Sequence, residues 1–460
     1  MFLPMMNRRR WVVLNISMGV YMSTLDASIV NISLPTIVRS LNTDLKAVAW
    51  VVMAYLIIIT GCLLLMGRLA DLLGRGQIFL LGFLTFTLGS TLCGISPTIQ
   101  FLIGSRVIQG LGASALMAIG PAIITTSFPE KDRGQILGML GSVVSLGFIT
   151  GPLMGGFLVE HLGWRSIFFI NLPIGMLGTL LSSKVLRGEQ ALSRVQLDLA
   201  GAFLFFLFMT FLLLFLNRVG WKSTPFFWGW IALALICLGL FIIIEYHSSS
   251  PLVDLYIFKK RLFVSSLGAS LLSFWMNGAH NFVIPFFLQM ILEYSPSQTG
   301  MLIFPVALTV MVIAPIGGRI SDWAGVRIPA TIGLIFTSLA IFSFVFLKGE
   351  VSYYEILWRQ VILGIGIGFF NPANNSAIIG SLPKANVGLA SSFLALARNL
   401  GMVIGVAFAE MVIACRIPAT PPSGRGLSLE GIQDVWRIMV MIGLIAIFLS
   451  WRRGKEELTS

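Results

Sequence analysis

Two acidic residues lie inside long apolar runs of the chain. Asp26 stands fifteen residues after Trp11 in the first run, and Glu410 lies in the run that begins near Gly388. A charge at the centre of a bilayer costs about 2.5 to 3.5 kcal/mol on insertion scales, so an acid in a membrane-spanning run is a candidate functional group. Such a carboxyl group can hold a proton or a cation. The chemistry indicated is reversible binding of a small positive charge.

Two arginines could act as counter-charges. Arg106 enters its run at a depth similar to that of Asp26, so the two could pair. Asp26 is either a proton-coupling group or a structural acid that is bonded to neighbouring hydroxyls or to Arg106. Glu410 shares a helical face with Asn399 and is either a coupling or substrate-binding acid, or the solvated end of a helix. Arg398 has no obvious local partner, so it either neutralises an acid across a cavity or attracts an anionic group.

Amide and aromatic side chains gather in the run that begins near Leu262. Asn277 aligns with Asp26 in the repeat described below, so only the first half keeps the acid. Amides beside aromatic rings suit a large, partly apolar ligand, and ring faces attract cations; the alternative is hydrogen bonding between helices, with aromatics facing lipid. Asn371-Pro372 predicts a break in its helix. The residues assigned to a substrate cavity are Met22, Asn31, Trp275, Asn277, His280, Asn281, Phe282, Asn371, Asn374, Arg398 and Asn399.

A duplicated set of apolar runs must position these residues. The letters GRLAD at 67–71 return 251 residues later as GRISD at 318–322. Runs of about 20 residues, enough to cross about 30 Å of hydrocarbon, predict fourteen transmembrane helices in an all-α membrane protein. We predict an N-terminal six-helix bundle at 1–190, an inserted lipid-facing helix pair at 191–255 and a C-terminal six-helix bundle at 256–460.

Short motifs predict a conformational latch and a close helix contact. An acid at the membrane edge can pair with a nearby arginine or cap a helix N-terminus, and such contacts can break when bundles rotate. The predicted latch residues are Arg68, Asp71, Arg75, Arg133 and Asp322. Gly147, Gly151 and Gly155, with Pro152 among them, allow two helix backbones to approach; they favour either a surface on which bundles rock or ordinary tight packing.

Composition excludes several classes of protein. Hydrophobic residues make up 57% of the chain and charged residues 11%, which excludes a soluble globular protein. Lys and Arg gather in alternate loops, so the net charge of +12 reflects membrane topology with both termini cytoplasmic, and no nucleic-acid partner is expected. Cys and His residues are scattered, without metal-ligand spacing, and neither a phosphate-binding loop nor a nucleophile constellation occurs. We therefore expect no enzyme activity, metal or cofactor, and an ion gradient as the energy source.

Several motifs resemble those of one superfamily. They read LDxxxxNxxLP at 25–35, GRLADLLGR at 67–75, RxxQGxG at 106–112, GxxxGPxxGG at 147–156 and WRxxFxxNxPxG at 164–175. Together they resemble the major facilitator superfamily, and within it the fourteen-helix drug:proton antiporters of the EmrB/QacA type. The resemblance supports Asp71 as a latch residue, whereas Asp322 departs from the pattern because Gly325-Val326-Arg327 follows where the first copy has Gly74-Arg75.

The resemblance implies proton-coupled export of amphiphilic, cationic drugs by alternating access. Asp26, Glu410 and Arg106 would handle the proton, and the partners would be protons, a small amphiphilic substrate and the lipid bilayer. A monomer in the bacterial inner membrane is expected. The alternatives are an exporter or flippase of a lipid or anionic metabolite, favoured by Arg398 and Arg106, an intramembrane enzyme, and a sensor that binds ligand without transporting it.

Overall fold

The computed structural model describes residues 5–128, 130–186, 199–218, 227–247, 255–382, 387–416 and 428–453. In these ranges every regular element is a helix. The first part holds α1 (Met5–Ser40), α2 (Leu45–Leu73), α3 (Arg75–Gly94), α4 (Ile99–Ser127), α5 (Glu130–Leu162), the short α6 (Ser166–Phe169) and α7 (Asn171–Val185). α8 (Leu199–Arg218) and α9 (Phe227–His247) follow. The last part holds the 3₁₀ turn η1 (Leu255–Lys259), α10 (Arg261–Phe286), the π turn η2 (Phe287–Ile291), α11 (Pro296–Ala324), α12 (Arg327–Phe344), α13 (Tyr353–Gly380), α14 (Val387–Ala414) and α15 (Leu429–Trp451).

Thirteen of the described helical segments are long and apolar enough to cross a membrane. α6 and α7 count together as one of them, and the described apolar stretch of α8, Ala200–Leu212, is shorter than a span. The protein is thus an all-helical multi-pass membrane protein. The number fourteen and the inserted helix pair remain predictions.

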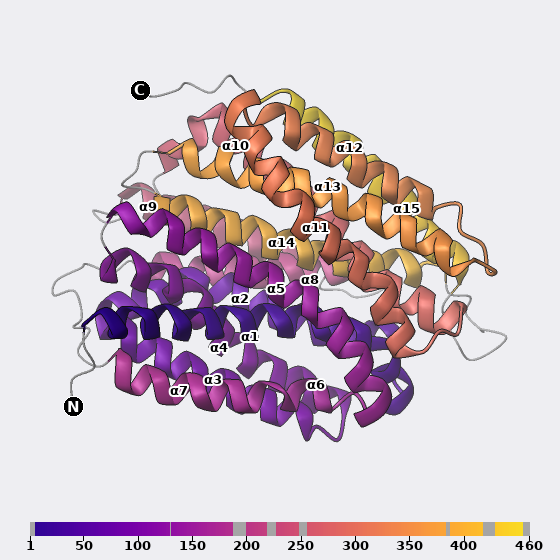
Figure 1. Ribbon diagram of the computed structural model, residues 1–460, viewed down its shortest axis with the longest axis horizontal. Coiled ribbons are helices and arrows are strands. Elements are labelled where there is room, and N and C mark those ends of the chain that lie inside the picture. The colour runs from indigo at the N-terminus through magenta and orange to yellow at the C-terminus, as the bar shows by residue number, and fades with distance from the viewer. Residues whose placement is uncertain are drawn as a thin grey trace. The chain divides into compact units, whose positions relative to one another are not determined.

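The chain divides into two compact units. The first comprises Met1–Phe211 and Ala232–Leu252, and the second comprises Leu212–Ile231 and Val253–Ser460. The first therefore contains α1 to α7 and the second contains α10 to α15, whereas α8 and α9 are each divided between them. Figure 1 shows long helices running side by side within each unit.

Local sequence determines where several helices begin. The side chain of Asp44 accepts a hydrogen bond from the backbone N–H of Ala47 at 2.7 Å, which caps α2. Ser295 and Gln298 form a reciprocal capping box at the start of α11. The predicted break at Asn371-Pro372 was wrong, because Pro372 lies inside the continuous α13. A proline removes only one backbone donor, and the rest of the helical ladder holds α13 together.

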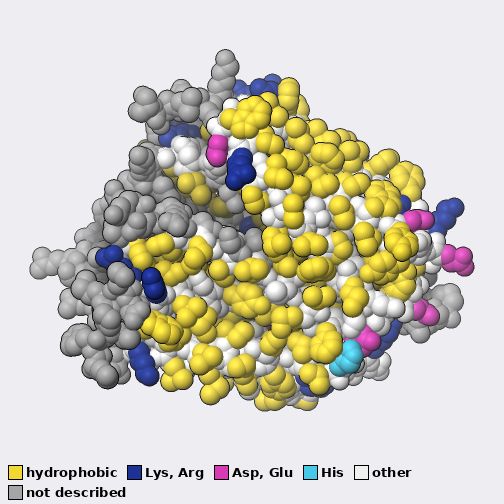
Figure 2. Space-filling model, in the orientation of Figure 1, with side chains coloured by type: hydrophobic (Ala, Val, Ile, Leu, Met, Phe, Trp, Pro, Cys, Tyr) yellow, Lys and Arg dark blue, Asp and Glu magenta, His cyan; other side chains and the backbone are white. Residues whose placement is uncertain are grey.

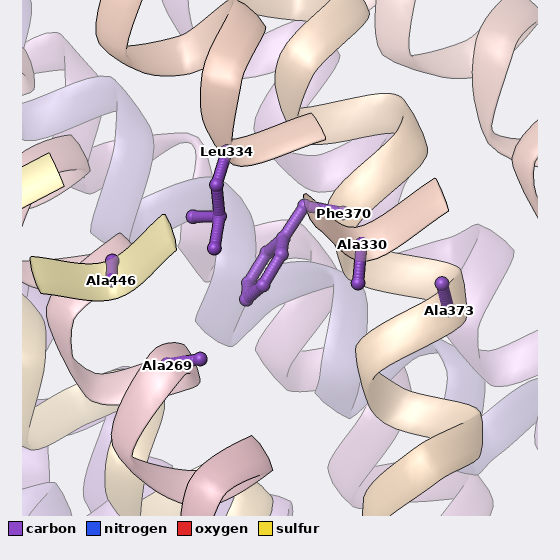
Figure 3. Packing of buried hydrophobic residues seen from close by; sticks show 6 residues of the cluster. All are labelled: Ala269, Ala330, Leu334, Phe370, Ala373 and Ala446. Atoms are coloured by element: carbon purple, nitrogen blue, oxygen red, sulfur yellow. The ribbon is translucent and has the colours of Figure 1, made fainter. Parts of the chain in front are cut away.

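Small residues bring the helices of the second unit together. Ala269 of α10, Ala330 and Leu334 of α12, Phe370 and Ala373 of α13, and Ala446 of α15 form one buried cluster, in which the Phe370 ring points toward Leu334 (Figure 3). Many large hydrophobic side chains are exposed, among them Leu88, Phe157 and Met441. Hydrophobic side chains cover most of the described face in Figure 2, and the charged side chains lie mainly toward its edges. This is the distribution expected of a surface that lies against lipid.

Candidate functional site: a buried carboxylate in the first unit

A buried ion pair lies in the first unit. Asp26 on α1 and Arg106 on α4 are joined by a contact of 2.5 Å between Oδ2 and Nη1, and the two side chains are 0% and 1% exposed, respectively. Taking two charges out of water is costly, and their attraction compensates only when further hydrogen bonds satisfy the remaining polar atoms. The neighbours of the pair therefore decide what it can do.

Two amides complete the surroundings of the carboxylate. Gln109 donates from Nε2 to Oδ1 of Asp26 at 2.8 Å, and Asn171 donates from Nδ2 to the same oxygen at 3.2 Å. Gln109 also accepts from Nη1 of Arg106 at 2.6 Å, so its amide bridges both members of the ion pair. The Nδ2 of Asn171 also lies 3.0 Å from the hydroxyl of Ser90 on α3. One carboxylate thus links α1, α4 and the start of α7.

The guanidinium of Arg106 has partners other than Asp26. Its Nε donates to the carbonyl oxygen of Val51 on α2 at 2.9 Å. The ring of Tyr55, also on α2, lies 4.0 Å from the guanidinium carbon, which is a cation–π distance. Tyr55 is fixed in turn, because its hydroxyl donates to the carbonyl oxygen of Ser23 at 3.1 Å. These contacts hold the cation in place independently of the charge on Asp26.

The surroundings of Asp26 stabilise an ionised carboxylate. When Asp26 is ionised, it accepts three side-chain donors and neutralises Arg106. Protonation would remove its charge and turn one carboxyl oxygen into a donor, although the atoms of Arg106, Gln109 and Asn171 that contact the carboxylate are all N–H donors. The proton would therefore weaken the links from α1 to α4 and α7, while Gln109 and Val51 continue to hold Arg106.

The equivalent place in the second unit carries no ion pair. Asn277 lies 251 residues after Asp26, and Gln360 lies 254 residues after Arg106. The same offsets relate Gly82 to Gly333 and Gly112 to Gly366. A Cβ on Gly82 would lie 3.2 Å from the backbone oxygen of Gly112, and a Cβ on Gly333 would lie 2.6 Å from the backbone oxygen of Gly366. Residues related by these offsets thus occupy equivalent helix contacts in the two units, although Asp26 and Arg106 are replaced by uncharged amides.

Amide and imidazole side chains occupy this place in the second unit. Asn277 donates to its own helix, from Nδ2 to the oxygen of Ser273 at 2.8 Å. The Nε2 of His280 lies 3.4 Å from Oε1 of Gln360, and the imidazole lies among the rings of Phe344 and Trp436. Since His280 is 1% exposed, this cluster is part of the packed interior.

The remaining predicted cavity residues differ in how deeply they are buried. Met22 and Phe282 are fully buried, and Asn399 is 5% exposed. A second group is half-buried, comprising Asn31, Trp275, Asn281, Asn371 and Arg398. Asn374 is fully buried and accepts a hydrogen bond from Arg453. Glu410 is 2% exposed, so in this structure its carboxyl group is turned away from water.

One of the two predicted latches contains an ion pair. Gly74 separates α2 from α3 with φ of 98°, a value that glycine adopts readily. The turn brings Arg75 back to Asp71, where Nη2 and Oδ1 lie 2.9 Å apart, and Nη1 of Arg75 donates to the oxygen of Ala122 on α4 at 3.1 Å. Arg68 is half-buried, and the side chain of Arg133 lies outside the described residues.

The second copy of the motif differs at the same turn. Val326 is inserted after Gly325, and the guanidinium of Arg327 lies 4.1 Å from the Trp451 ring. Asp322 is exposed and forms no ion pair with any other side chain that the structure describes. The extra residue thus separates the acid from the arginine.

Glycines place α5 directly against α1. A Cβ on Gly147 would lie 2.1 Å from Oγ1 of Thr24, and one on Gly155 would lie 2.8 Å from Cγ1 of Ile29. The hydroxyl of Ser28 donates to the backbone oxygen of Gly147 at 3.0 Å, so the two backbones are linked as well as close. Pro152 is buried within α5. The helix that carries Asp26 is therefore held on this side by a contact between backbones.

Gly151→Ala is expected to destabilise the protein by about 1 to 3 kcal/mol, the usual cost of overpacking. The new Cβ would lie 1.8 Å from Oγ and 2.8 Å from Cβ of Ser28. Gly141→Ala is the matched control, because it lies in the same helix and its Cβ would meet nothing within 4 Å. Thermal unfolding in detergent measures both. Equal melting temperatures for the two variants would show that the α1–α5 contact is not tight.

Sequence reasoning missed the neutral members of the carboxylate network. Gln109 and Asn171 lie in motifs that could be read in the sequence, yet neither was assigned a role because neither is charged. Tyr55 and Ser90 lie in ordinary apolar runs and carry no signal in the sequence. Among the described side chains, no three His, Cys, Asp or Glu residues are placed to hold a metal ion.

Known proteins resemble the chain in sequence and in fold. Residues 16–406 match the family model of the Major Facilitator Superfamily. The riboflavin transporter RibZ of Clostridioides difficile (strain 630) is 36% identical over 87% of this chain and 88% of its own length. The multidrug resistance protein Stp of Mycobacterium tuberculosis (strain CDC 1551 / Oshkosh) is 31% identical over 88% of this chain and 75% of its own. The crystal structure of a bacterial homologue of the human lysosomal transporter Spinster superposes with a TM-score of 0.69 at 16% identity, covering 96% of each chain, a likeness of fold alone.

Proposed function

This chain belongs to the Major Facilitator Superfamily and is a transporter rather than an enzyme, and from this premise we propose that it is a proton-coupled exporter of amphiphilic cations. The observation that carries the proposal is the buried carboxylate of Asp26, which is bound by Arg106, Gln109 and Asn171. Relatives named as multidrug proteins, including the multidrug transporter MdtP of Bacillus subtilis (strain 168) at 30% identity, support a drug as the substrate.

The proposed cycle uses the carboxylate as a switch. Ionised Asp26 holds α1, α4 and α7 together through one anion. Proton uptake removes the anion, loosens these helices and favours one orientation of the transport pathway, and proton release restores the network and favours the other. Substrate moves outward because binding of the substrate and of the proton favour opposite states. The glycine contact between α1 and α5 would serve as the surface on which the helices shift.

The proposal includes the direction of the chain in the membrane. Both termini lie in the cytoplasm of a bacterial cell, since Lys and Arg gather in alternate loops beginning with Arg8, Arg9 and Arg10. Glu410 and Arg398 would lie near the substrate pathway in the second unit, where an acid attracts cations and an arginine restricts them. Asp71 and Arg75 would act as a latch that opens and closes during the cycle.

A second candidate function is transport of a flavin or another planar metabolite. The 36% identity to a riboflavin transporter favours it. The half-buried Arg398 would support a flavin phosphate or another anionic metabolite, because a cation in the pathway would attract a phosphate or carboxylate group. Export or flipping of a lipid anion rests on the same residue.

Substrate-induced proton release distinguishes the candidates. Purified protein in weakly buffered detergent is titrated with a lipophilic cation, with riboflavin and with a long-chain anion, while a pH indicator records released protons. The proposal expects release only with the cation, and no release from Asp26→Asn. Release triggered by riboflavin or by the anion would select the second candidate. Binding without release from any compound would contradict proton coupling.

A further inference from the structure

A buried arginine lies two residues after the end of α15. Arg453 is 4% exposed, and its Nη2 donates to Oδ1 of Asn374 on α13 at 2.5 Å. Asn374 is itself fully buried. The pair joins α15 to α13 at one end of the helices of the second unit, and no other hydrogen bond of Arg453 is found among the described residues.

Three buried donors of this pair have no acceptor. Nε and Nη1 of Arg453 and Nδ2 of Asn374 are all enclosed and without a hydrogen-bond partner in the described part of the chain. Guanidinium and amide N–H groups can only donate, so these three atoms require hydrogen-bond acceptors. A neutral acceptor such as water would satisfy some donors and leave the charge uncompensated.

The pKa of Arg453 also indicates that no anionic side chain that the structure describes lies beside its guanidinium. Burial lowers the pKa of Arg453 to about 10, with no opposing contribution from an acid. Among the ion pairs of the described residues, none includes Arg453. A buried arginine is normally paired, because its charge is otherwise strongly disfavoured.

The first unit contains a comparable arginine that is paired with a carboxylate. There Arg75 contacts the oxygen of Ala122 on α4 and also pairs with the carboxylate of Asp71. The residue 254 positions after Ala122 is Ser376, two residues from Asn374. A guanidinium therefore meets the corresponding helix at about the same level in both units, but among the described residues only the first unit supplies an anion to it.

The surroundings favour an anion at a membrane surface. Trp451 and Arg452, the two residues before Arg453, are exposed, and Arg327 lies over the Trp451 ring. Arginines beside an exposed tryptophan at the end of a transmembrane helix are typical of the lipid headgroup region. The buried donors thus lie one residue away from a basic, aromatic surface.

We propose that Arg453 and Asn374 form a binding site for a single phosphate oxyanion. The oxygens of a phosphate group accept several hydrogen bonds at once and match the fork of an arginine. The group belongs either to an anionic lipid headgroup or to free phosphate. When bound it ties α15 to α13 and compensates the buried charge.

Thermal unfolding of the full chain in detergent tests the site. Wild type is titrated at constant ionic strength with sodium phosphate, with short-chain phosphatidylglycerol and with short-chain phosphatidylcholine. We expect a saturable rise in melting temperature with phosphate or with phosphatidylglycerol, and an apparent affinity at least about tenfold weaker in Arg453→Gln. Arg261→Gln is the matched control, because Arg261 is an exposed arginine at the start of α10 in the same unit, and it should respond like wild type.

A second variant tests the site by filling it. Asn374→Asp places a carboxylate beside the guanidinium, so it should raise the melting temperature without ligand and abolish the response to added anion. A response to phosphate identifies a free anion as the ligand, and a response to phosphatidylglycerol alone identifies a lipid. The proposal is overturned if wild type and Arg453→Gln respond equally, or if neither responds. It is also overturned if wild type does not respond but the double variant Glu456→Gln, Glu457→Gln does. That result would assign the site to the chain's own carboxylates.

Discussion

Asp26→Asn is expected to reduce substrate transport driven by a pH gradient by roughly 10²-fold or more, which is the usual loss when a positioned proton-transfer group is removed. The amide can still accept and donate hydrogen bonds, but it cannot take up a proton between about pH 5 and 8. Proteoliposomes with an imposed pH gradient and a fluorescent lipophilic cation measure the effect.

Ser33→Ala is the matched control for this experiment. Ser33 is also a fully buried polar residue of α1, but within the described part of the chain its hydroxyl bonds only to the oxygen of Val30 in its own helix. Its removal should leave pH-driven transport within about twofold of wild type, because this hydroxyl is bonded within α1 and not to a member of the carboxylate network. Undiminished coupling in Asp26→Asn would make the carboxylate structural and would direct attention to Glu410.

Arg106→Gln is expected to lower the free energy of unfolding by about 3 to 5 kcal/mol, because it leaves the buried carboxylate of Asp26 without its counter-charge. Asp26→Asn should also destabilise the protein, by stranding Arg106. The double variant should lose much less than the sum of the two, since it removes both charges. It copies the pair Asn277 and Gln360, which the second unit holds at the equivalent place.

A double-mutant cycle measures this coupling. Unfolding free energies in mixed micelles are compared for wild type, both single variants and the double variant. The double variant should recover stability while remaining inactive in pH-driven transport, which separates the structural part of the pair from its role in transport. Additive losses would mean that the two side chains do not depend on each other.

Hydrophobic runs and short motifs predicted most of the helices. An apolar run of about 20 residues can hardly be anything except a membrane span. The exact number of spans was harder to predict, because α8 shows only Ala200–Leu212 as a described apolar stretch. The break predicted at Pro372 was wrong because local sequence does not reveal how much of the ladder around a proline remains intact.

The charged residues of the site could be predicted from the sequence, but the contacts between them could not. Asp26 and Arg106 stand out in the sequence because charges are rare in apolar runs. Their pairing was only one of the alternatives, because 80 residues separate them and depth alone does not fix which helix faces which. Asn171 lies 145 residues from Asp26, so its contact depends on how α7 packs. Such contacts follow from tertiary packing, which a single sequence does not encode in a readable way.

The charge of the buried pair, Asp26 and Arg106, also bears on how the protein would respond to the membrane potential. With Asp26 ionised, the site is electrically neutral, because the charges of Asp26 and Arg106 cancel. With Asp26 protonated, the same site carries one net positive charge within a transmembrane segment. A potential of 100 mV acts on one elementary charge with about 2.3 kcal/mol across the full membrane. Voltage would therefore act on the net charge of this pair only if Asp26 is protonated.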